Sequence, residues 1–138
     1  MKLTRRDAIA LGAGAVVVAA LPVHAMAPGD EQIAAFTGGA DIAEGGVTLN
    51  APEIAENGNT VPIEVSADGA AEIMVLALGN PTPPVATFKF GPLSASRSAS
   101  TRIRLAQTQD ILAVAKMEDG SFAKATATVK VTIGGCGG

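Results

Sequence analysis

Apolar and polar residues alternate over much of the chain between residues 47 and 133. Val61, Ile63 and Val65, for example, are each separated by one residue that is less suited to a core. Because successive side chains of a strand point to opposite faces, this alternation predicts β-strands with one buried face. Other segments are mostly apolar, as strands at the centre of a core would be. The predicted strands cover residues 47–49, 61–66, 73–78, 86–90, 101–105, 111–117 and 123–133.

Turn-forming residues divide these segments. Asn57-Gly58-Asn59 precedes the strand at 61–66, and Glu118-Asp119-Gly120-Ser121 predicts a hairpin turn because Asp-Gly tolerates positive φ. Pro62 lacks a donor N–H, which indicates an edge strand or one of the first residues of a strand. Before the strands, Asp30 can cap a short helix that Gly38-Gly39 would end.

The spacing of the predicted strands indicates the fold class. About seven strands recur at intervals near ten residues, and no long helical pattern interrupts them. This is typical of an all-β fold, a two-sheet antiparallel sandwich, here with a short N-terminal helix and spanning residues 28–133. The chain of 138 residues is long enough for one such domain with its own core.

A cleavable signal peptide is predicted to precede this domain. Lys2, Arg5 and Arg6 carry positive charge, an apolar run follows over residues 8–23, and Ala25-Met26-Ala27 offers a cleavage site between small residues. The apolar run is short for a membrane span of about 20 residues, so a membrane anchor is the less favoured alternative.

The two adjacent arginines indicate an export route. Thr4-Arg5-Arg6-Asp7 resembles the start of a twin-arginine signal, which exports folded proteins, although Ala8-Ile9-Ala10 departs from its usual continuation. An ordinary secretory signal that contains two arginines is the alternative. Residues 1–27 are therefore expected to be removed on export to the periplasm.

Removing this segment limits the chemistry that is left. The single histidine, His24, lies within residues 1–27, and the sequence has no Trp, no Tyr and one Cys. A Ser-His-Asp or Cys-His site and a blue-copper site all need histidine. Of ten Lys and Arg residues three fall in the signal peptide, but only one of thirteen Asp and Glu does. The remaining domain is acidic, so binding to nucleic acid, which needs a basic surface, is not expected.

The single cysteine, Cys136, has two glycines on either side. Such a segment has almost no apolar surface to bury, and glycine loses the most backbone entropy on ordering. We therefore expect an exposed thiol on a flexible arm, residues 134–138, whose other members are Gly134, Gly135, Gly137 and Gly138. Five extended residues span roughly 17 Å, enough to bring a bound group to a neighbouring protein.

No Arg, His or Lys flanks Cys136 in the sequence. A catalytic cysteine needs a nearby cation or helix N-terminus to activate its thiol, whereas a carrier can rely on the enzymes that it visits. The sequence therefore favours a carrier and not an enzyme.

Three stretches beyond the signal peptide match one known family. They are Ala34-Ala35-Phe36-Thr37-Gly38-Gly39, Pro52-Glu53-Ile54-Ala55-Glu56-Asn57-Gly58-Asn59-Thr60-Val61-Pro62 and Val131-Thr132-Ile133-Gly134-Gly135-Cys136-Gly137-Gly138. Together with the Arg5-Arg6 signal, they make the chain resemble the SoxY family, the substrate-carrying subunits of the bacterial thiosulfate-oxidising Sox system. The similarity covers nearly the whole chain, and the glycine-cysteine-glycine end is specific to the family.

The resemblance implies an immunoglobulin-like sandwich that pairs with a second subunit, SoxZ, and carries its substrate on Cys136. In the family, the c-type cytochrome SoxXA joins thiosulfate oxidatively to the thiol, and the metal-dependent hydrolase SoxB then releases sulfate. The molybdenum enzyme SoxCD can oxidise the sulfane sulfur that stays behind. The resemblance implies no cofactor on the carrier itself.

Two other functions suit parts of the sequence. Gly137-Gly138 would fit a ubiquitin-like sulfur carrier whose terminal carboxylate becomes a thiocarboxylate, but that activation uses cytoplasmic ATP and conflicts with an export signal. An exported sandwich could also be a structural or binding module whose Cys136 forms an intermolecular disulfide. Sulfur on the terminal carboxylate would identify the first, and sulfur oxidation that survives Cys136→Ser would identify the second.

Overall fold

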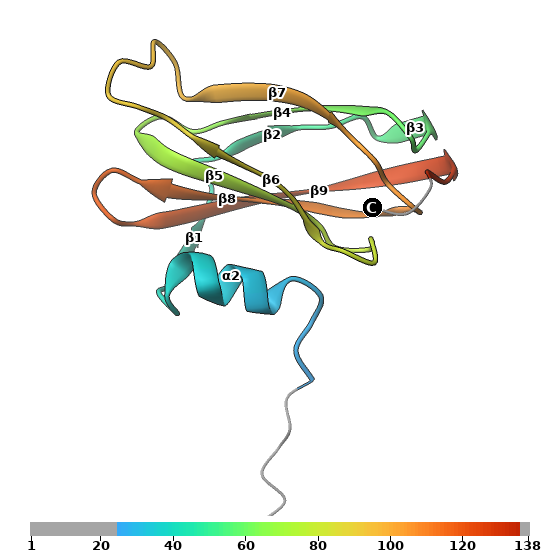
Figure 1. Ribbon diagram of the computed structural model, residues 1–138, viewed down its shortest axis with the longest axis horizontal. Helices are drawn as coiled ribbons and strands as arrows, with labels where there is room; N and C mark the ends of the chain where they lie inside the picture. The colour runs from blue at the N-terminus through green and yellow to red at the C-terminus, as the bar shows by residue number, and fades with distance from the viewer. Residues whose placement is uncertain (1–24, 136–138) are drawn as a thin grey trace, which may run out of the picture.

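The computed structural model describes residues 25–135, which form two β-sheets packed face to face with one helix outside them (Figure 1). The larger sheet has the strand order β1-β9-β8-β5-β6, with β3 also pairing with β9, and the smaller sheet has the order β2-β4-β7. The elements are α2 (Asp30–Thr37), β1 (Ile42–Glu44), β2 (Thr48–Asn50), β3 (Ile54–Asn57), β4 (Val61–Ser66), β5 (Ala70–Ala77), β6 (Pro84–Lys89), β7 (Ser98–Ile103), β8 (Gln109–Met117) and β9 (Phe122–Ile133).

Two strand pairs are parallel, β1 with β9 and β3 with β9, and the other pairs, including β8 with β9, are antiparallel. The longest pairing joins β8 to β9 through the predicted hairpin turn, where Gly120 takes a φ of 87°. The sequence-based fold class is therefore confirmed: the protein is a mostly β, two-sheet, immunoglobulin-like sandwich with one short N-terminal helix.

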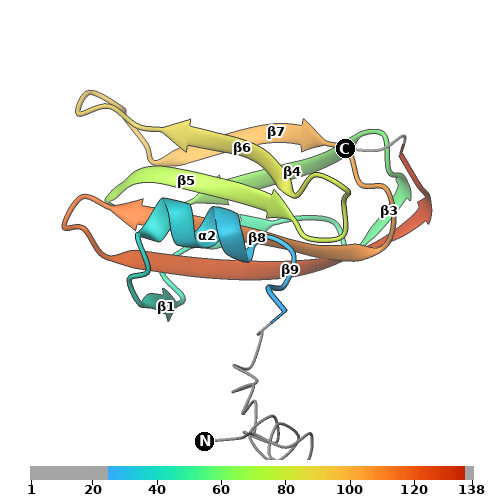
Figure 2. The same ribbon diagram turned by 60° about the horizontal axis from the view of Figure 1, so that its bottom comes forward.

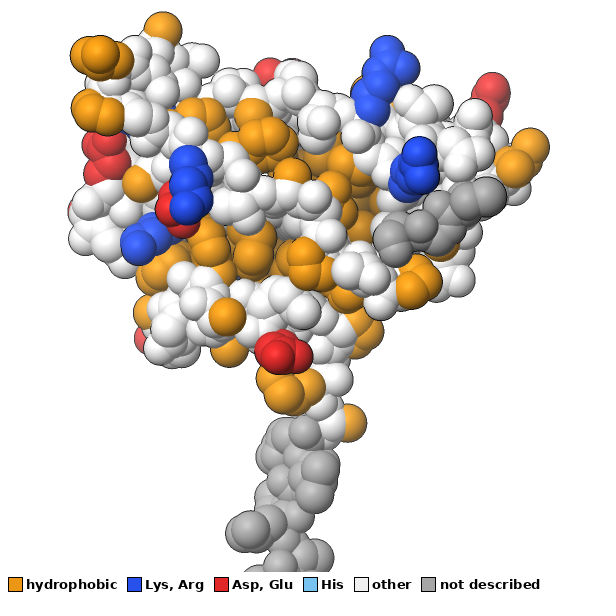
Figure 3. Space-filling model, viewed as in Figure 1, with side chains coloured by type: hydrophobic (Ala, Val, Ile, Leu, Met, Phe, Trp, Pro, Cys, Tyr) orange, Lys and Arg blue, Asp and Glu red, His pale blue; other side chains and the backbone are white. Residues whose placement is uncertain are grey.

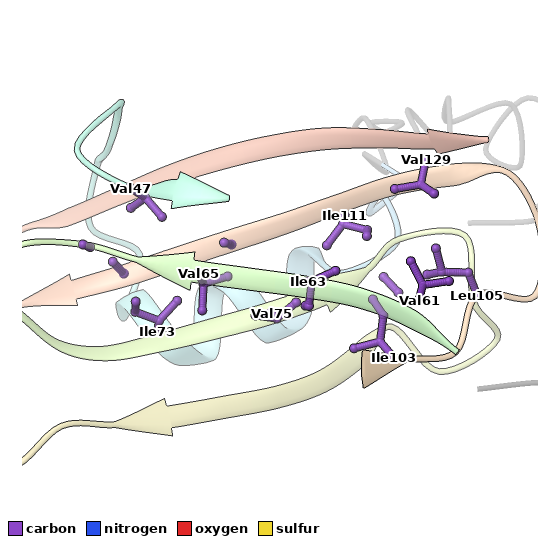
Figure 4. Packing of buried hydrophobic residues seen from close by; sticks show 14 of the residues in the cluster. Val47, Val61, Ile63, Val65, Ile73, Val75, Ile103, Leu105, Ile111 and Val129 are labelled. Carbon is purple, nitrogen blue, oxygen red and sulfur yellow. The ribbon is translucent and has the colours of Figure 1, made fainter. Parts of the chain in front are cut away.

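The inner faces of the two sheets meet in one apolar core. In β4, Val61, Ile63 and Val65 are buried whereas Pro62 and Glu64 are exposed, so the alternation in the sequence predicted the faces of this strand. Burying one such aliphatic side chain contributes about 1.5–3 kcal/mol. The core side chains labelled in Figure 4 come from strands of both sheets and from two connecting segments, and are Val47, Val61, Ile63, Val65, Ile73, Val75, Ile103, Leu105, Ile111 and Val129.

Helix α2 covers the outer face of the larger sheet, where it lies over β5 and β8 and runs roughly along them (Figure 2). A second apolar cluster lies between them and consists of Met74, Leu76, Leu112 and Val114, packed against Ile33, Phe36, Ile42 and Leu78. Phe36 also meets Phe122 edge to face, with ring centroids 5.9 Å apart. Because β5 and β8 are covered on both faces, their sequences are apolar without alternation.

The structure corrects or narrows several sequence-based expectations. The strand predicted at residues 101–105 is β7, Ser98–Ile103. Asp30 is not the helix cap: the N-cap residue is Gly29, with a φ of 89°, and the Asp30 carboxylate accepts a hydrogen bond from the Ala27 N–H (2.7 Å). Pro62 is the second residue of a central strand, so only the predicted position near a strand's beginning is confirmed. The sequence does not predict β1 and β3, which are short and lack clear alternation.

Candidate functional site

Only part of the predicted site falls within the described residues. Gly134 and Gly135 are described, and they follow directly after β9. The predicted export and arm residues that lie outside the described range are Arg5, Arg6, Cys136, Gly137 and Gly138. The candidate site is therefore the place where the chain leaves β9 on its way to Cys136.

Backbone hydrogen bonds join this end of β9 to two loops. Gly58, in the turn after β3, donates its N–H to the Ile133 carbonyl (2.8 Å), and its own carbonyl accepts from the Leu105 N–H (2.7 Å). Gly135 donates its N–H to the carbonyl of the same Leu105 (2.8 Å), which is fully buried. Figure 1 shows β3 and β9 finishing at the same end of the sandwich. The three bonded segments, residues 57–59, 104–107 and 134–135, are called the root clamp below.

The glycines of the root clamp have no room for a side chain. A Cβ atom on Gly58 would lie 2.3 Å from the Leu105 carbonyl oxygen and 2.7 Å from the Gly135 nitrogen. One on Gly134 would lie 2.3 Å from the Ala106 carbonyl oxygen, and one on Gly135 would lie 2.7 Å from the Gly58 carbonyl oxygen. These glycines therefore permit a close approach of three backbone segments.

Two buried amide side chains hold the middle segment of the clamp. The Oδ1 atom of Asn80 accepts hydrogen bonds from the Ala106 N–H (2.9 Å) and from Gln109 Nε2 (2.8 Å), and its Nδ2 donates to the Arg104 carbonyl (2.8 Å). Gln109 Nε2 also donates to the Gln107 carbonyl (3.0 Å). Asn80 and Gln109 are only 6% and 7% exposed, so loss of a partner would leave a buried polar group unsatisfied.

Positive charge lies beside the root clamp. Arg102 and Arg104 are both exposed, and neither forms an ion pair with another residue in the range 25–135. The Arg102 guanidinium donates a hydrogen bond to Thr60 Oγ1 (3.4 Å), next to the clamp, and Arg104 is part of the clamp itself. In Figure 3, Lys and Arg side chains stand at two places on the visible face, one of which is the end where β9 finishes. The two arginines place positive charge at this end, where Glu56 of β3 is exposed as well.

Arg102 also borders a groove on the outer face of the smaller sheet. The groove has a volume of about 550 Å³ and lies over β2, β4 and β7, where Pro62 and Glu64 face outward. Its charged lining residues are Glu64 and Arg102, which have opposite signs, so the groove has no net preference for an anion.

Ionisable groups elsewhere show little that suggests catalysis. The pKa of Asp119 lies below its ordinary value because the hydroxyl and N–H of Ser121 donate hydrogen bonds to its carboxylate, but this hairpin lies at the opposite end of β9. Within residues 25–135 no group of three or more His, Cys, Asp or Glu side chains could hold a metal ion. No helix in the same range is long and apolar enough to cross a membrane.

Sequence reasoning missed most of this site. It treats Asn57-Gly58-Asn59 only as a turn, although Gly58 lies in one of the stretches that carry the family resemblance. Asn80 and Gln109 could not be paired, because 29 positions separate them in the sequence. Arg102 and Arg104 approach the end of β9 only through the fold, and no local pattern marks them.

Together, the fold and the site define an immunoglobulin-like sandwich whose C-terminal segment leaves from an anchored end with two exposed arginines. Residues 33–136 match the family described as sulfur oxidation protein SoxY. Among solved structures, the sulfur carrier protein SoxY from Chlorobium limicola f thiosulfatophilum is 37% identical, with a TM-score of 0.68 over 77% of this chain and 97% of that chain. The chain therefore belongs to the SoxY family of sulfur carrier proteins of the Sox system, as the resemblance predicted.

A more distant structure extends the comparison of folds. A superoxide reductase (neelaredoxin) from Ignicoccus hospitalis is 18% identical and covers 63% of this chain and 80% of that chain, with a TM-score of 0.55. At this identity the likeness shows the shared sandwich fold alone. No match was found among curated protein sequences. Members of the SoxY family are generally non-catalytic carriers and are typically periplasmic.

Proposed function

We propose that this protein carries thiosulfate-derived sulfur covalently on the Cys136 thiol and presents it to partner enzymes in the periplasm. The observation that supports this most strongly is that the SoxY match extends to Cys136, one residue beyond the backbone anchored at the root clamp. A cysteine in that place stays attached to the domain while other proteins can reach it.

The proposed chemistry needs only a thiol from this chain. In the loading step a sulfur–sulfur bond forms between Cys136 Sγ and the sulfane sulfur of thiosulfate; the thiol loses its proton, and two electrons pass to the c-type cytochrome SoxXA. SoxB then adds water at the sulfonate sulfur, which releases sulfate and leaves a persulfide on the cysteine. SoxCD can oxidise that remaining sulfur. We propose these three enzymes as transient partners that bring their own cofactors.

The charge beside the root clamp supports an anionic cargo. Thiosulfate and the loaded thiosulfonate group are both negative, and the formal net charge of the chain is −3. Repulsion from an acidic domain would oppose their approach. Arg102 and Arg104 offset this repulsion at the end from which Cys136 leaves.

We further propose that SoxZ forms a stable heterodimer with this chain at the open side of the sandwich. On this side β6 pairs only with β5 and β7 pairs only with β4. Phe88 and Phe90 are half-buried there, and Leu93, in the connection between β6 and β7, is 98% exposed. Figure 3 shows hydrophobic side chains across the middle of this face. A partner would cover such edges and apolar side chains.

Residues 1–27 are proposed to be a cleaved signal peptide of the twin-arginine type, and residues 28–133 the folded domain. The exported protein would then begin near Met26 or Pro28 and lack His24. This processing leaves the whole described sandwich intact, because its first element, α2, begins at Asp30.

Intact mass spectrometry of the native exported protein, with fragmentation to locate any adduct, tests the proposed function. We expect a sulfur-containing adduct on Cys136 and SoxZ in the purified complex. Sulfur on the terminal carboxylate would support the ubiquitin-like alternative instead. Sulfur oxidation that continues in a Cys136→Ser strain would support a structural module with an intermolecular disulfide.

A further inference from the structure

We infer that the chain stays fixed to the sandwich through Gly135, and that the root clamp, held by Asn80 and Gln109, sets the direction in which Cys136 leaves the domain. In this arrangement Gly134 and Gly135 are a rigid base for the rest of the arm. The inference rests on the proposed carrier function, because it assigns a role to the base of the proposed arm.

Hydrogen bonds on either side of Gly134 fix the backbone there. The Ile133 carbonyl accepts from the Gly58 N–H (2.8 Å), and the Gly135 N–H donates to the Leu105 carbonyl (2.8 Å). Gly134 therefore lies between two residues that are bonded to different loops. Ile133 also pairs with Asn57 of β3, so the strand is held up to the point where Gly134 begins.

Gly134 and Gly135 are closely packed against backbone atoms of other segments. A glycine that serves only as a flexible joint would be surrounded by open space, as Gly91 is, where an added Cβ atom would meet nothing within 4 Å. An added Cβ on Gly134 would instead lie 2.3 Å from the Ala106 carbonyl oxygen. Gly134 and Gly135 thus serve close packing against backbone atoms, the other use of glycine.

The buried amide side chains of Asn80 and Gln109 hold the segment that binds Gly135. Residues 104–107 lie in the connection between β7 and β8 and belong to neither strand, so sheet pairing does not fix them. The Asn80 side chain binds the Arg104 carbonyl and the Ala106 N–H, one on each side of Leu105. It thereby holds the Leu105 peptide that receives Gly135. Gln109 orients the Asn80 amide by donating to its Oδ1 (2.8 Å), so both are positioning residues for the arm.

A fixed base gives a carrier a physical advantage. Ordering a backbone residue costs conformational entropy. Residues that are already ordered do not incur that cost again when an enzyme binds the arm, which is how preorganisation raises affinity. The base also brings the thiol to each enzyme from the same direction.

NMR relaxation of the backbone amides in the exported protein tests the fixed base directly. We expect order parameters near about 0.85 at Gly134 and Gly135, as in rigid backbone, falling below about 0.6 at Gly137 and Gly138. The Gly135 amide should also exchange its hydrogen slowly, because it donates to the carbonyl of the fully buried Leu105. Order parameters below about 0.6 at Gly134 and Gly135 would overturn the inference.

A matched pair of variants tests the positioning role while leaving every arm residue unchanged. Asn80→Ala removes the buried amide, and Asn50→Ala makes the same chemical change at an exposed position of β2. Each is loaded in two ways. With tetrathionate, the Cys136 thiolate attacks a central sulfur and thiosulfate leaves with the electron pair, so no enzyme or further oxidant is needed. With thiosulfate and SoxXA, an enzyme must receive the arm.

Asn80→Ala should load with tetrathionate at the unmodified rate but lose roughly tenfold or more in SoxXA-dependent kcat/KM, because small misplacements of a reacting group cost large factors in rate. Asn50→Ala should change neither rate. A folded Asn80→Ala protein that loads normally by both routes would overturn the positioning role. If Asn80→Ala does not fold, the relaxation result on the unmodified protein decides. Failure of Cys136 to load at all would overturn the proposed carrier function, whereas the order parameters of Gly134 and Gly135 would still test the fixed base.

Discussion

Replacing Gly58 with alanine is expected to destabilise the domain, although the change adds a single methyl group. The new Cβ atom would lie 2.3 Å from the Leu105 carbonyl oxygen and 2.7 Å from the Gly135 nitrogen. Both contacts are with backbone atoms, so a whole segment of the root clamp must move to relieve them. Overpacking of this kind costs about 1–3 kcal/mol.

The displaced segment would also lose hydrogen bonds. The Leu105 N–H donates to the Gly58 carbonyl at 2.7 Å, and a net contribution of about 0.5–1.5 kcal/mol is usual for one such bond. We therefore expect Gly58→Ala to lower the free energy of unfolding by about 2–4 kcal/mol. For a domain of this size the melting temperature should fall by roughly 10 °C or more.

Thermal and urea unfolding of the exported protein would measure this loss. Gly91→Ala is the matched control, since its Cβ atom would meet nothing within 4 Å and its φ is not positive. We expect this control to stay within about 0.5 kcal/mol of the unmodified protein. If Gly58→Ala is as stable as Gly91→Ala, the segments of the root clamp can move apart without loss of stability, and the reasoning from close backbone approach is wrong.

Three further changes test other parts of the account. Cys136→Ser should change the free energy of unfolding by no more than about 0.5 kcal/mol relative to the unmodified protein, which thermal melts would measure. It should abolish covalent loading, which mass spectrometry would detect, because a hydroxyl cannot form the sulfur–sulfur bond. Changing Arg102 and Arg104 together to Gln should slow the reaction of Cys136 with anionic tetrathionate severalfold, and most at low salt. The reaction with the neutral reagent dithiodipyridine should keep its rate. Equal slowing of the two reactions would contradict the charge effect. Leu93→Asp should weaken co-purification with SoxZ and spare the melting temperature, because this side chain is 98% exposed; undiminished co-purification would place the interface elsewhere.

The sequence predicts the strands of this protein well because most of them have one buried face. The alternation of Val61, Ile63 and Val65 gives both the position and the orientation of β4. The apolar stretch from Ile73 onward predicts a central strand, but it cannot show that α2 covers the outer face of the sheet. The strands β1 and β3 owe their existence to parallel pairing with β9, a long-range contact that leaves no local pattern.

Of the candidate site, the sequence predicts only the glycine-rich segment around Cys136. The glycines around Cys136 mark the segment as unusual in the sequence itself. They do not distinguish a glycine needed for mobility from one needed for close packing, because both uses require the absence of a side chain. That distinction depends on Ala106, which lies 28 positions before Gly134, and on Gly58, which lies 77 positions before Gly135. Only the fold brings them together.

The position of β9 in the chain has a consequence for biosynthesis. β9 follows every other strand in sequence, yet β8, β1 and β3 all pair with it. While a ribosome is still making the earlier residues, β1 and β3 have no neighbour to bond, and the larger sheet lacks its second member. The larger sheet can therefore complete itself only after residues 122–133 have left the ribosome. The proposed twin-arginine route exports proteins already folded, so export by that route would have to follow the pairing of β9.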